Sequence, residues 1–327
     1  MSEKPKMSAS ELGALWMTYH KKGVILRMLE YFIETTDDPK AKDLMSGLCK
    51  QLHQKVIEMK TMFENEGVMP PEGFIEKDVN LKAPKLWENG FDIMFSRILK
   101  EISVGMYALH LTMTYRKDII KLYQGLSKLS ETFYGHFTEY LLEKDFLSRP
   151  NYVNMPVSID FITDKDYAKG TNIMGYKRTL NTVEFGPLYH AMETNITGMQ
   201  LMDGFIQTAK DEEVKMYFTV GKGLAKEQIR EISKILLKND IQPPVTPGST
   251  VTNSTIAPFS ERLMMFCTYL LNGLALGGGG FGAGFSLRND LQIKNAIFGK
   301  DIFQYQRNGI MLMMSKGWLE EPPKMDL

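Results

Sequence analysis

The sequence is poor in cysteine, and its positive and negative charges cancel. Its 327 residues include only two cysteines, Cys49 and Cys267, which are too few for a disulfide framework and indicate a reducing compartment. Lysine and arginine number 39, and so do aspartate and glutamate, so the basic excess of a broad nucleic-acid-binding surface is missing. The N-terminal stretch MSEKPKMSAS has no apolar run of the kind found in secretory signals. These absences predict a cytoplasmic protein that does not bind nucleic acid.

Familiar motifs for catalysis and nucleotide binding are also missing. No Glu-x-x-His pair of the carboxylate-bridged di-iron bundles occurs, and the nearest matches are reversed, from His136 to Glu139 and from His190 to Glu193. The glycine-rich stretch Gly277–Gly284 lacks the preceding strand and the following Lys-Ser/Thr of a phosphate-binding loop. No Ser-His-Asp or Cys-His arrangement is indicated by the spacings.

What the sequence does contain is a duplication. When residues 11–71 are placed on residues 184–244, a shift of 173, eleven of the 61 positions are identical. A shift of 172 continues the match as far as Pro150 and Pro322, and the matched pairs keep the same order. We therefore predict two tandem repeats, at residues 8–150 and 181–323, joined by a linker at residues 151–180.

Each repeat has the pattern of four helices. Apolar residues recur at helical spacing over residues 9–36. Ser8 with Glu11, and Asn181 with Glu184, have the spacing of a capping box, so we interpret both glutamates as helix caps in preference to catalytic acids. The other predicted helices begin at Asp38 and Asp211, span 91–116 and 259–287, and begin at Asp118 and Asp290.

The connections predict how these helices are arranged. Helices one and two are joined by a few residues, as are helices three and four, so each pair is antiparallel. About 20 residues (Met69 to Asn89) separate helices two and three, and they reach about 66 Å when extended. A helix of 28 residues is about 42 Å long, so the chain can return along the whole bundle. Two antiparallel pairs with one long crossover define the ferritin-like topology, and we predict an all-α fold of two tandem ferritin-like four-helix bundles.

One predicted helix is long and uncharged. The segment Leu263–Leu287 carries no charged residue, and its length suffices to cross a bilayer. The matching helix of the first repeat carries Asp92, Arg97 and Lys100, so we favour a helix buried inside the protein over a membrane span. Its glycines, at Gly277–Gly284, are expected to let another helix approach closely.

Four of the five histidines lie in the first repeat, one on each predicted helix. A rise of 1.5 Å per residue places His20, His53, Glu101 and His136 at similar heights, with His110 elsewhere. Imidazole and carboxylate ligands from four helices are typical of metal sites in bundles, so this layer is a candidate site for a transition metal. The alternative is that these histidines are ordinary half-buried side chains, because the apolar stripes of their helices place His20 and His53 at the flank.

A second candidate metal site lies in the second repeat. His190 and Glu193 share one helical turn and therefore face the same way, and the same holds for Glu227 and Glu231. Together with Cys267 these residues lie on three predicted helices. Since Glu231 is matched by a glutamate in the first repeat, a structural role is the alternative.

Four stretches carry a resemblance to a known family: DVNLKAPKLWENGF (78–91), APFSERLMMF (257–266), SLRNDL (286–291) and GWLEEPP (317–323). Over nearly its whole length the chain resembles an uncharacterised family of spore-forming bacilli, whose members carry two tandem ferritin-like bundles and are related to spore-coat-F-like proteins. The resemblance implies the fold and a link to sporulation or stress, and it implies no activity.

The expected function is a non-enzymatic structural or interaction role, in the cytoplasm or associated with the spore. The expected partner is another protein or a second copy of the chain. The alternative is a metal-binding protein, holding iron, manganese or zinc at one of the two candidate sites, with oxidative or storage activity.

Overall fold

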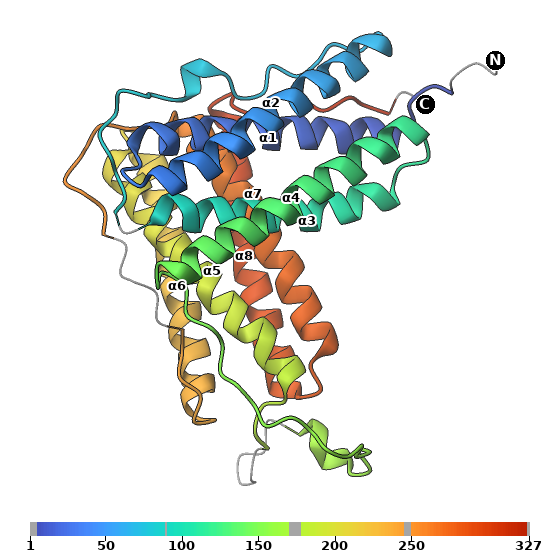
Figure 1. The fold of residues 1–327 in the computed structure, drawn as a ribbon, viewed down its shortest axis with the longest axis vertical. Coiled ribbons are helices and arrows are strands. Elements are labelled where there is room, and N and C mark those ends of the chain that lie inside the picture. Colours follow the sequence, from blue (N-terminus) through green and yellow to red (C-terminus); the bar gives the residue numbers. More distant parts are fainter. Residues whose placement is uncertain (1–4, 89, 170–177, 245–249, 326–327) are drawn as a thin grey trace.

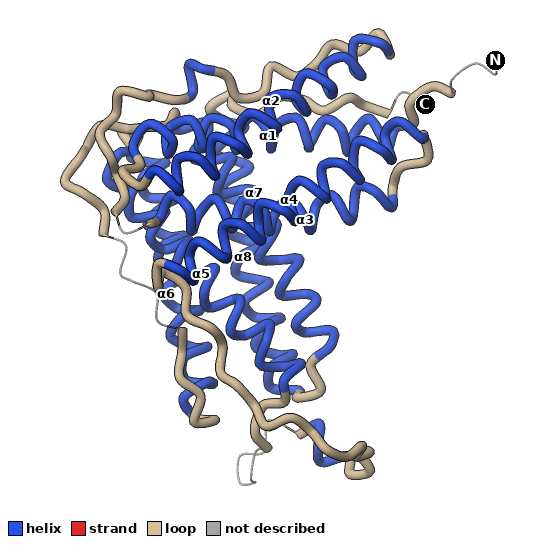
Figure 2. The backbone as a smooth tube through the Cα atoms, viewed as in Figure 1, coloured by secondary structure: helices blue, strands red, loops and turns tan. Residues whose placement is uncertain are grey.

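The computed structural model describes residues 5–88, 90–169, 178–244 and 250–325, and its long helices form two sets of four (Figures 1 and 2). The first half contains α1 (Ala9–Thr35), α2 (Pro39–Asn65), α3 (Phe91–Thr112) and α4 (Lys117–Glu143). The second half contains α5 (Thr182–Thr208), α6 (Glu212–Leu237), α7 (Glu261–Phe285) and α8 (Asn289–Ser315). The predicted all-α fold of two tandem helical bundles is confirmed.

Local caps determine where the helices begin. Ser8 accepts a hydrogen bond from the backbone N–H of Glu11, and the Glu11 carboxylate accepts one from the backbone N–H of Ser8 (2.8 Å), which completes a capping box. Asn181 and Glu184 repeat this box at the start of α5. The interpretation of both glutamates as caps is confirmed.

The same two glutamates also connect distant segments of each half. The second carboxylate oxygen of Glu11 accepts the backbone N–H groups of Tyr115 and Arg116 (2.8 and 2.7 Å), in the loop between α3 and α4. Glu184 accepts the backbone N–H groups of Leu287 and Arg288, which match Tyr115 and Arg116 and lie between α7 and α8. Each half therefore fixes the start of its first helix to its last interhelical loop in the same way.

Within each half, the first and second helices pack against each other, as do the third and fourth. The chain crosses between the second and third helices over residues 66–90 in the first half and 238–260 in the second, so the long crossover that the sequence predicts is present. The helices of one half run across those of the other (Figure 1).

The two crossovers pair with each other where the halves meet. Isolated antiparallel bridges join Val79 to Phe259 and Trp87 to Val251. A shift of 172 carries Val79 onto Val251 and Trp87 onto Phe259, so each bridge is the image of the other. This is the contact pattern of a twofold axis, and the halves pack like the two subunits of a symmetric dimer.

Both halves share one hydrophobic core. The Cys267 Sγ atom on α7 lies 3.7 Å from the Met28 Sδ atom on α1. The ring of Phe266 lies 5.1 Å from the ring of Phe74 in the first crossover. A single cluster of buried apolar residues continues through these contacts from one half into the other.

Helix α7, which contains most of the uncharged segment that begins at Leu263, is divided between two environments. In the described part of the chain it alone has the length and apolar composition to cross a membrane. Its first part, Leu263 to Leu270, is almost wholly buried between the halves, but most residues from 273 to 285 are exposed or half-buried, so the expected full burial is wrong there. Beside Gly277–Gly280 an added Cβ atom would meet nothing within 4 Å, so the expected close approach of another helix is wrong for these four glycines. At Gly282 an added Cβ atom would lie 3.1 Å from Pro187 of α5, so there the expectation is confirmed.

Candidate functional site

The four residues of the first predicted metal layer lie apart. His20 is buried with its ring 5.7 Å from that of Phe266, whereas His136 is exposed on α4. His53 pairs with a carboxylate of α1, and Glu101 pairs with a histidine of α5. The helical rise predicts the height of a side chain but not the direction in which it points, which is why the layer of four is not assembled.

The second predicted set is also dispersed. Cys267 is fully buried between the halves. Glu227 pairs with an arginine one turn away, and Glu231 pairs with a lysine of its own helix and one of α8. His190 and Glu193 lie at the contact of α5 with α3, far along the chain from these partners.

Members of both predicted sets meet at that contact. The Nε2 atom of His190 lies 2.9 Å from an Oε2 atom of Glu101, whose other oxygen lies 3.3 Å from Arg97. The hydrogen bond to Glu101 raises the pKa of His190, and burial raises the pKa of the nearby Glu193. These opposite charges are already paired, so the group joins the two halves electrostatically.

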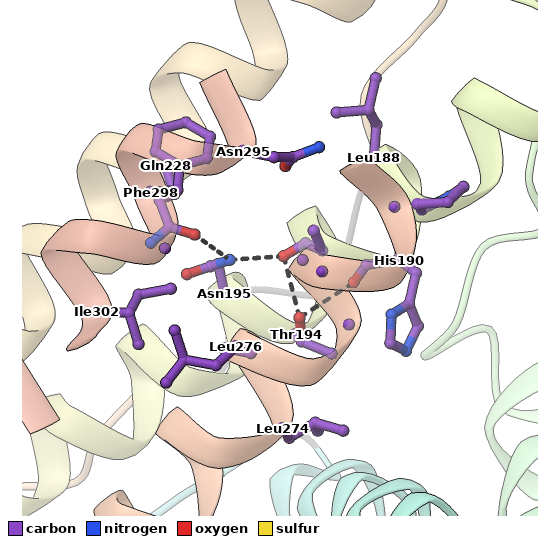
Figure 3. A pocket seen from close by; sticks show the side chains of 18 of the residues that line it. Leu188, His190, Thr194, Asn195, Gln228, Leu274, Leu276, Asn295, Phe298 and Ile302 are labelled. Atoms are coloured by element: carbon purple, nitrogen blue, oxygen red, sulfur yellow. Dashed lines mark hydrogen bonds between the residues drawn. The ribbon is translucent and has the colours of Figure 1, made fainter. Parts of the chain in front are cut away.

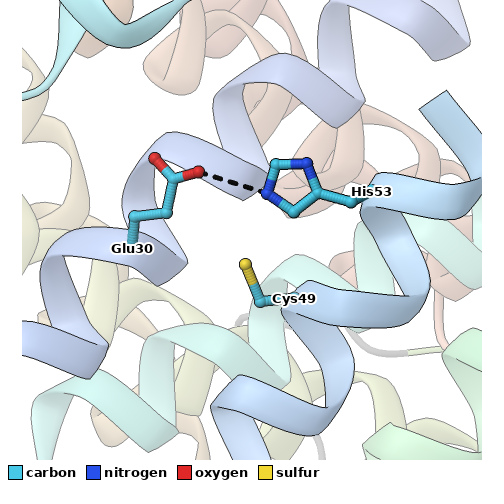
Figure 4. A group of neighbouring side chains, drawn as sticks. All are labelled: Glu30, Cys49 and His53. Carbon is cyan, nitrogen blue, oxygen red and sulfur yellow. Dashed lines mark ion pairs between the residues drawn. The ribbon is translucent and has the colours of Figure 1, made fainter. Parts of the chain in front are cut away.

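A different group has the geometry of a metal site. The side chains of Glu30, Cys49 and His53 point toward one another (Figure 4). Within the described ranges they form the group of three whose possible ligand atoms all lie within 4.8 Å of one another. His53 was predicted from the sequence as a metal ligand and its partners were not, although Cys49 and His53 have the i, i+4 spacing that puts both on one face of α2.

The chemistry of this group suits zinc. A thiolate, an imidazole and a carboxylate are zinc ligands, and three protein ligands leave a fourth position open. Burial raises the pKa of the Cys49 thiol to about 11 and also raises the pKa of Glu30. Arg27 donates a hydrogen bond of 2.5 Å to Glu30, so a metal ion has to displace both the thiol proton and this arginine.

A cavity of about 700 Å³ lies inside the second half, between α5, α6, α7 and α8 (Figure 3). Its volume is within the range of small-molecule sites, which are mostly apolar with a few polar groups. The walls are mainly aliphatic and aromatic and include Leu188, Leu274, Leu276, Phe298 and Ile302.

A few neutral polar side chains also line this cavity. The Nδ2 group of Asn195 donates to the side-chain oxygen of Gln228 (3.2 Å) and to the Ala191 carbonyl (2.8 Å), as Figure 3 shows. The two ionisable residues of acidic or imidazole type in the lining are engaged elsewhere, since His190 pairs with Glu101 and Glu184 with Arg178. The cavity therefore offers amide and hydroxyl groups to an occupant.

In the first half, buried aromatic side chains occupy positions that match the lining of this cavity. Under the shift of 172, Gly279 stands where the first half has Tyr107, and Asn295 where it has Tyr123. Both tyrosine rings are fully buried and lie 6.0 Å apart. The second half has thus replaced buried aromatic rings by small or polar residues, and both replacements line its cavity.

Three buried lysines lie near one another in the first half, and two of them lie over the ring of Tyr107. Lys21, Lys22 and Lys100 are fully buried, and their Nζ atoms have no hydrogen-bond partner within the described residues. The Nζ atom of Lys21 lies 3.7 Å from the centre of the Tyr107 ring, and that of Lys22 lies 4.9 Å away. In the second half the matching positions line the cavity and are neutral: Thr194, Asn195 and Asn272.

This cavity was not predicted from the sequence. A signal was present in the aligned repeats, because Gly279 opposite Tyr107 replaces a large aromatic side chain by none. Whether the neighbouring side chains then collapse into the space depends on how they pack, which two aligned sequences do not show.

Three comparisons with known proteins give the following results. A crystal structure of a protein from Bacillus halodurans C-125, provisionally described as a spore coat protein, is similar to part of this chain. The match covers 46% of this chain and 97% of that protein, with 19% sequence identity and a TM-score of 0.44. No curated protein matches the chain. The protein family of unknown function DUF3231 matches residues 1–157 and again residues 168–326. The chain therefore belongs to the DUF3231 family and carries its domain twice in tandem.

Proposed function

We propose that the chain is a binding protein, and that the second half holds a small, mostly apolar molecule in the cavity between α5, α6, α7 and α8. The replacement of buried tyrosines by Gly279 and Asn295 carries this proposal, because it opens a space of about 700 Å³ in a helix arrangement that is filled in the first half. An empty cavity forfeits packing contacts and destabilises the fold in proportion to its volume. An occupant restores those contacts.

The lining favours binding over catalysis. General acid–base or nucleophilic chemistry needs an ionisable group that is free to exchange a proton. The acidic and imidazole groups of the lining, Glu184 and His190, are held in ion pairs, and Glu184 also serves as a helix cap. The remaining polar groups are amides and hydroxyls, which orient a ligand.

An apolar entrance supports the proposal. Val183, Phe281 and Phe285 all line the cavity, and they are 58%, 72% and 64% exposed. Large apolar side chains at the rim of a cavity are typical of ligand-binding grooves. A mostly apolar molecule can therefore pass from solvent or from a carrier without crossing a charged rim.

The test uses a residue that closes the cavity. Gly279→Tyr restores the side chain that the first half has at this position, and nothing lies within 4 Å of the Cβ atom that it adds. Native mass spectrometry and solvent extraction of the full chain are expected to find a bound small molecule in the wild type and none in Gly279→Tyr.

Gly277→Ala is the matched control, because Gly277 lies on the same helix, also has free space beside it and does not line the cavity. This variant is expected to retain the molecule. Equal amounts bound to all three proteins, or none in any of them, contradict the proposal.

A second candidate function is zinc binding at Glu30, Cys49 and His53, which is supported by the mutual proximity of their ligand atoms. Titration with Zn²⁺ is expected to show one site whose affinity rises with pH, because the raised pKa of Cys49 makes the metal compete with a proton. His53→Ala is expected to abolish the site. His136→Ala is the control, since His136 is exposed on α4. Equal zinc binding in both variants, or none in the wild type, excludes this site.

The cellular setting is a further part of the proposal. The family resemblance implies a cytoplasmic or spore-associated protein of a spore-forming bacillus that acts with another protein or with a second copy of itself. Immunodetection in fractionated vegetative cells and spores tests the location, and light scattering of the purified chain tests self-association.

A further inference from the structure

We infer that the occupant of this cavity is an uncharged molecule that contains a planar aromatic ring and a hydrogen-bonding substituent. This inference rests on the proposed function and names the class of ligand. It follows from what fills the matching space in the first half.

Aromatic side chains of the first half show what kind of group fits in the matching space. Tyr107 is fully buried, and its phenol ring lies in the interior of the first bundle. The ring of Tyr123 lies 6.0 Å from it, and the ring of His110 lies 5.5 Å from that of Tyr123. These three aromatic side chains together fill the interior between α1, α3 and α4.

The second half lacks all three rings at the matching positions, which are Gly279, Asn295 and Gly282. Matching contacts in the two halves support this alignment of positions. Arg116 and Arg288 each donate to the aspartate two residues further on, and each also donates its backbone N–H to the capping glutamate of its own half. Beside Gly282 the space is taken by Pro187, whose Cβ atom lies 3.1 Å from the position of an added Cβ, whereas beside Gly279 nothing lies within 4 Å. The space left in the second half is therefore that of the tyrosine rings.

The lining excludes a charged occupant. Lys21, Lys22 and Lys100 of the first half are replaced by Thr194, Asn195 and Asn272. An ionised ligand in this interior would find no opposite charge to compensate its loss of water. A neutral ligand loses little on entering.

Unused hydrogen-bonding capacity indicates a polar substituent on the ring. The Tyr305 hydroxyl lines the cavity and is buried beside the hydroxyl of Tyr217, and a hydroxyl that shares one hydrogen bond can still make another. The amides of Asn195 and Gln228 also line the cavity and contribute further donors and acceptors. A hydroxyl or carbonyl group on the ligand can satisfy these groups, whereas a plain hydrocarbon leaves them unpaired.

The test is a calorimetric titration of the full chain, stripped of any bound molecule, with three probes. 1-Naphthol presents a neutral ring with a hydroxyl, 1-naphthoate the same ring with a charge, and 1-decanol a hydroxyl on a flexible chain. We expect 1-naphthol to bind about tenfold or more tightly than either of the others. Gly279→Tyr is expected to abolish this binding and Gly277→Ala to preserve it.

A fourth titration examines the polar contact. Asn195→Leu is expected to weaken the binding of 1-naphthol about tenfold and to leave naphthalene binding unchanged or stronger. Equal weakening of both would show that the substitution distorts the cavity and that Asn195 does not recognise the substituent.

The outcomes separate the inference from the proposed function. If 1-decanol binds best and Gly279→Tyr abolishes its binding, the cavity is a ligand site but the aromatic class is wrong. If 1-naphthoate binds best, the requirement for a neutral ligand is wrong. If no probe binds to the wild type, or binding persists in Gly279→Tyr, both the inference and the proposed function fall.

Discussion

Lys100 lies in the middle of the first bundle with its ammonium group removed from water. Burial lowers its pKa to about 7, and its Nζ atom has no hydrogen-bond partner among the residues described. Burial also lowers the pKa of Lys21 and Lys22 well below the usual range. Unpaired buried charges oppose folding, so these three lysines are expected to lower the free energy of unfolding.

Replacing this lysine by an apolar residue of similar length is therefore expected to stabilise the protein. Lys100→Met keeps the packing of the side chain and removes the desolvation of the ammonium group. We expect the free energy of unfolding at pH 7 to rise by about 1–4 kcal/mol, measured by urea denaturation. A decrease would show that the ammonium group has a stabilising partner.

The gain is expected to depend on pH. Between the folded pKa of about 7 and the unfolded value of 10.5, the unfolded chain binds the Lys100 proton and the folded chain does not, so the stability of the wild type rises with pH. The advantage of Lys100→Met should shrink from pH 7 to pH 9 by about 1.4 kcal/mol per unit. Lys128→Met, at an exposed position of α4, should show no such trend.

At the scale of helices, Glu11 joins two elements through one carboxylate. Glu11→Gln replaces an acceptor oxygen by a donor, so it leaves backbone N–H groups of Ser8 or of residues 115 and 116 without an acceptor. We expect the free energy of unfolding to fall by about 1–3 kcal/mol. Glu131→Gln on the exposed face of α4 is the control and should change it little.

The symmetry of the repeat extends this prediction to Glu184, which caps α5 and binds the loop before α8. Because Arg178 also pairs with Glu184, Glu184→Gln should lower the free energy of unfolding by at least as much as Glu11→Gln. A markedly smaller loss would show that the second cap contributes less than its geometry suggests.

Helix boundaries were predictable because their signals are local. The predicted helix at 9–36 corresponds to α1 at Ala9–Thr35, and the capping glutamates were assigned from spacing alone. The third helix was predicted to end at residue 116 but ends at Thr112, because the next backbone N–H groups bind Glu11 from a distant part of the chain. A contact that spans 104 residues leaves no local signature.

At the scale of the whole molecule, the shared core predicts how the protein unfolds. Since one apolar cluster runs through both halves, differential scanning calorimetry should show a single transition. Phe266→Ala should lower the temperature of that one transition, at a cost of about 3–5 kcal/mol, without splitting it. Two separate transitions in the wild type would show that the halves unfold independently.

The sites were less predictable than the fold. His53 was found from residue type, and Cys49 shares its face of α2, but Glu30 joins them only because α1 and α2 turn these faces toward each other. The layer of His20, Glu101 and His136 failed for the same reason, since rotation about a helix axis is decided by packing. The cavity depends on side chains that do not collapse, which is again a property of the packed molecule.

The reciprocal bridges between the crossovers have a consequence for how this family can diversify. When two identical subunits form such a dimer, one gene specifies both, so a mutation that opens one interior opens the other and removes packing from the molecule twice. Joining the copies in one chain ends this obligation. Here one copy has kept its aromatic filling while the other has lost it, and the retained copy supports the altered one through the core they share.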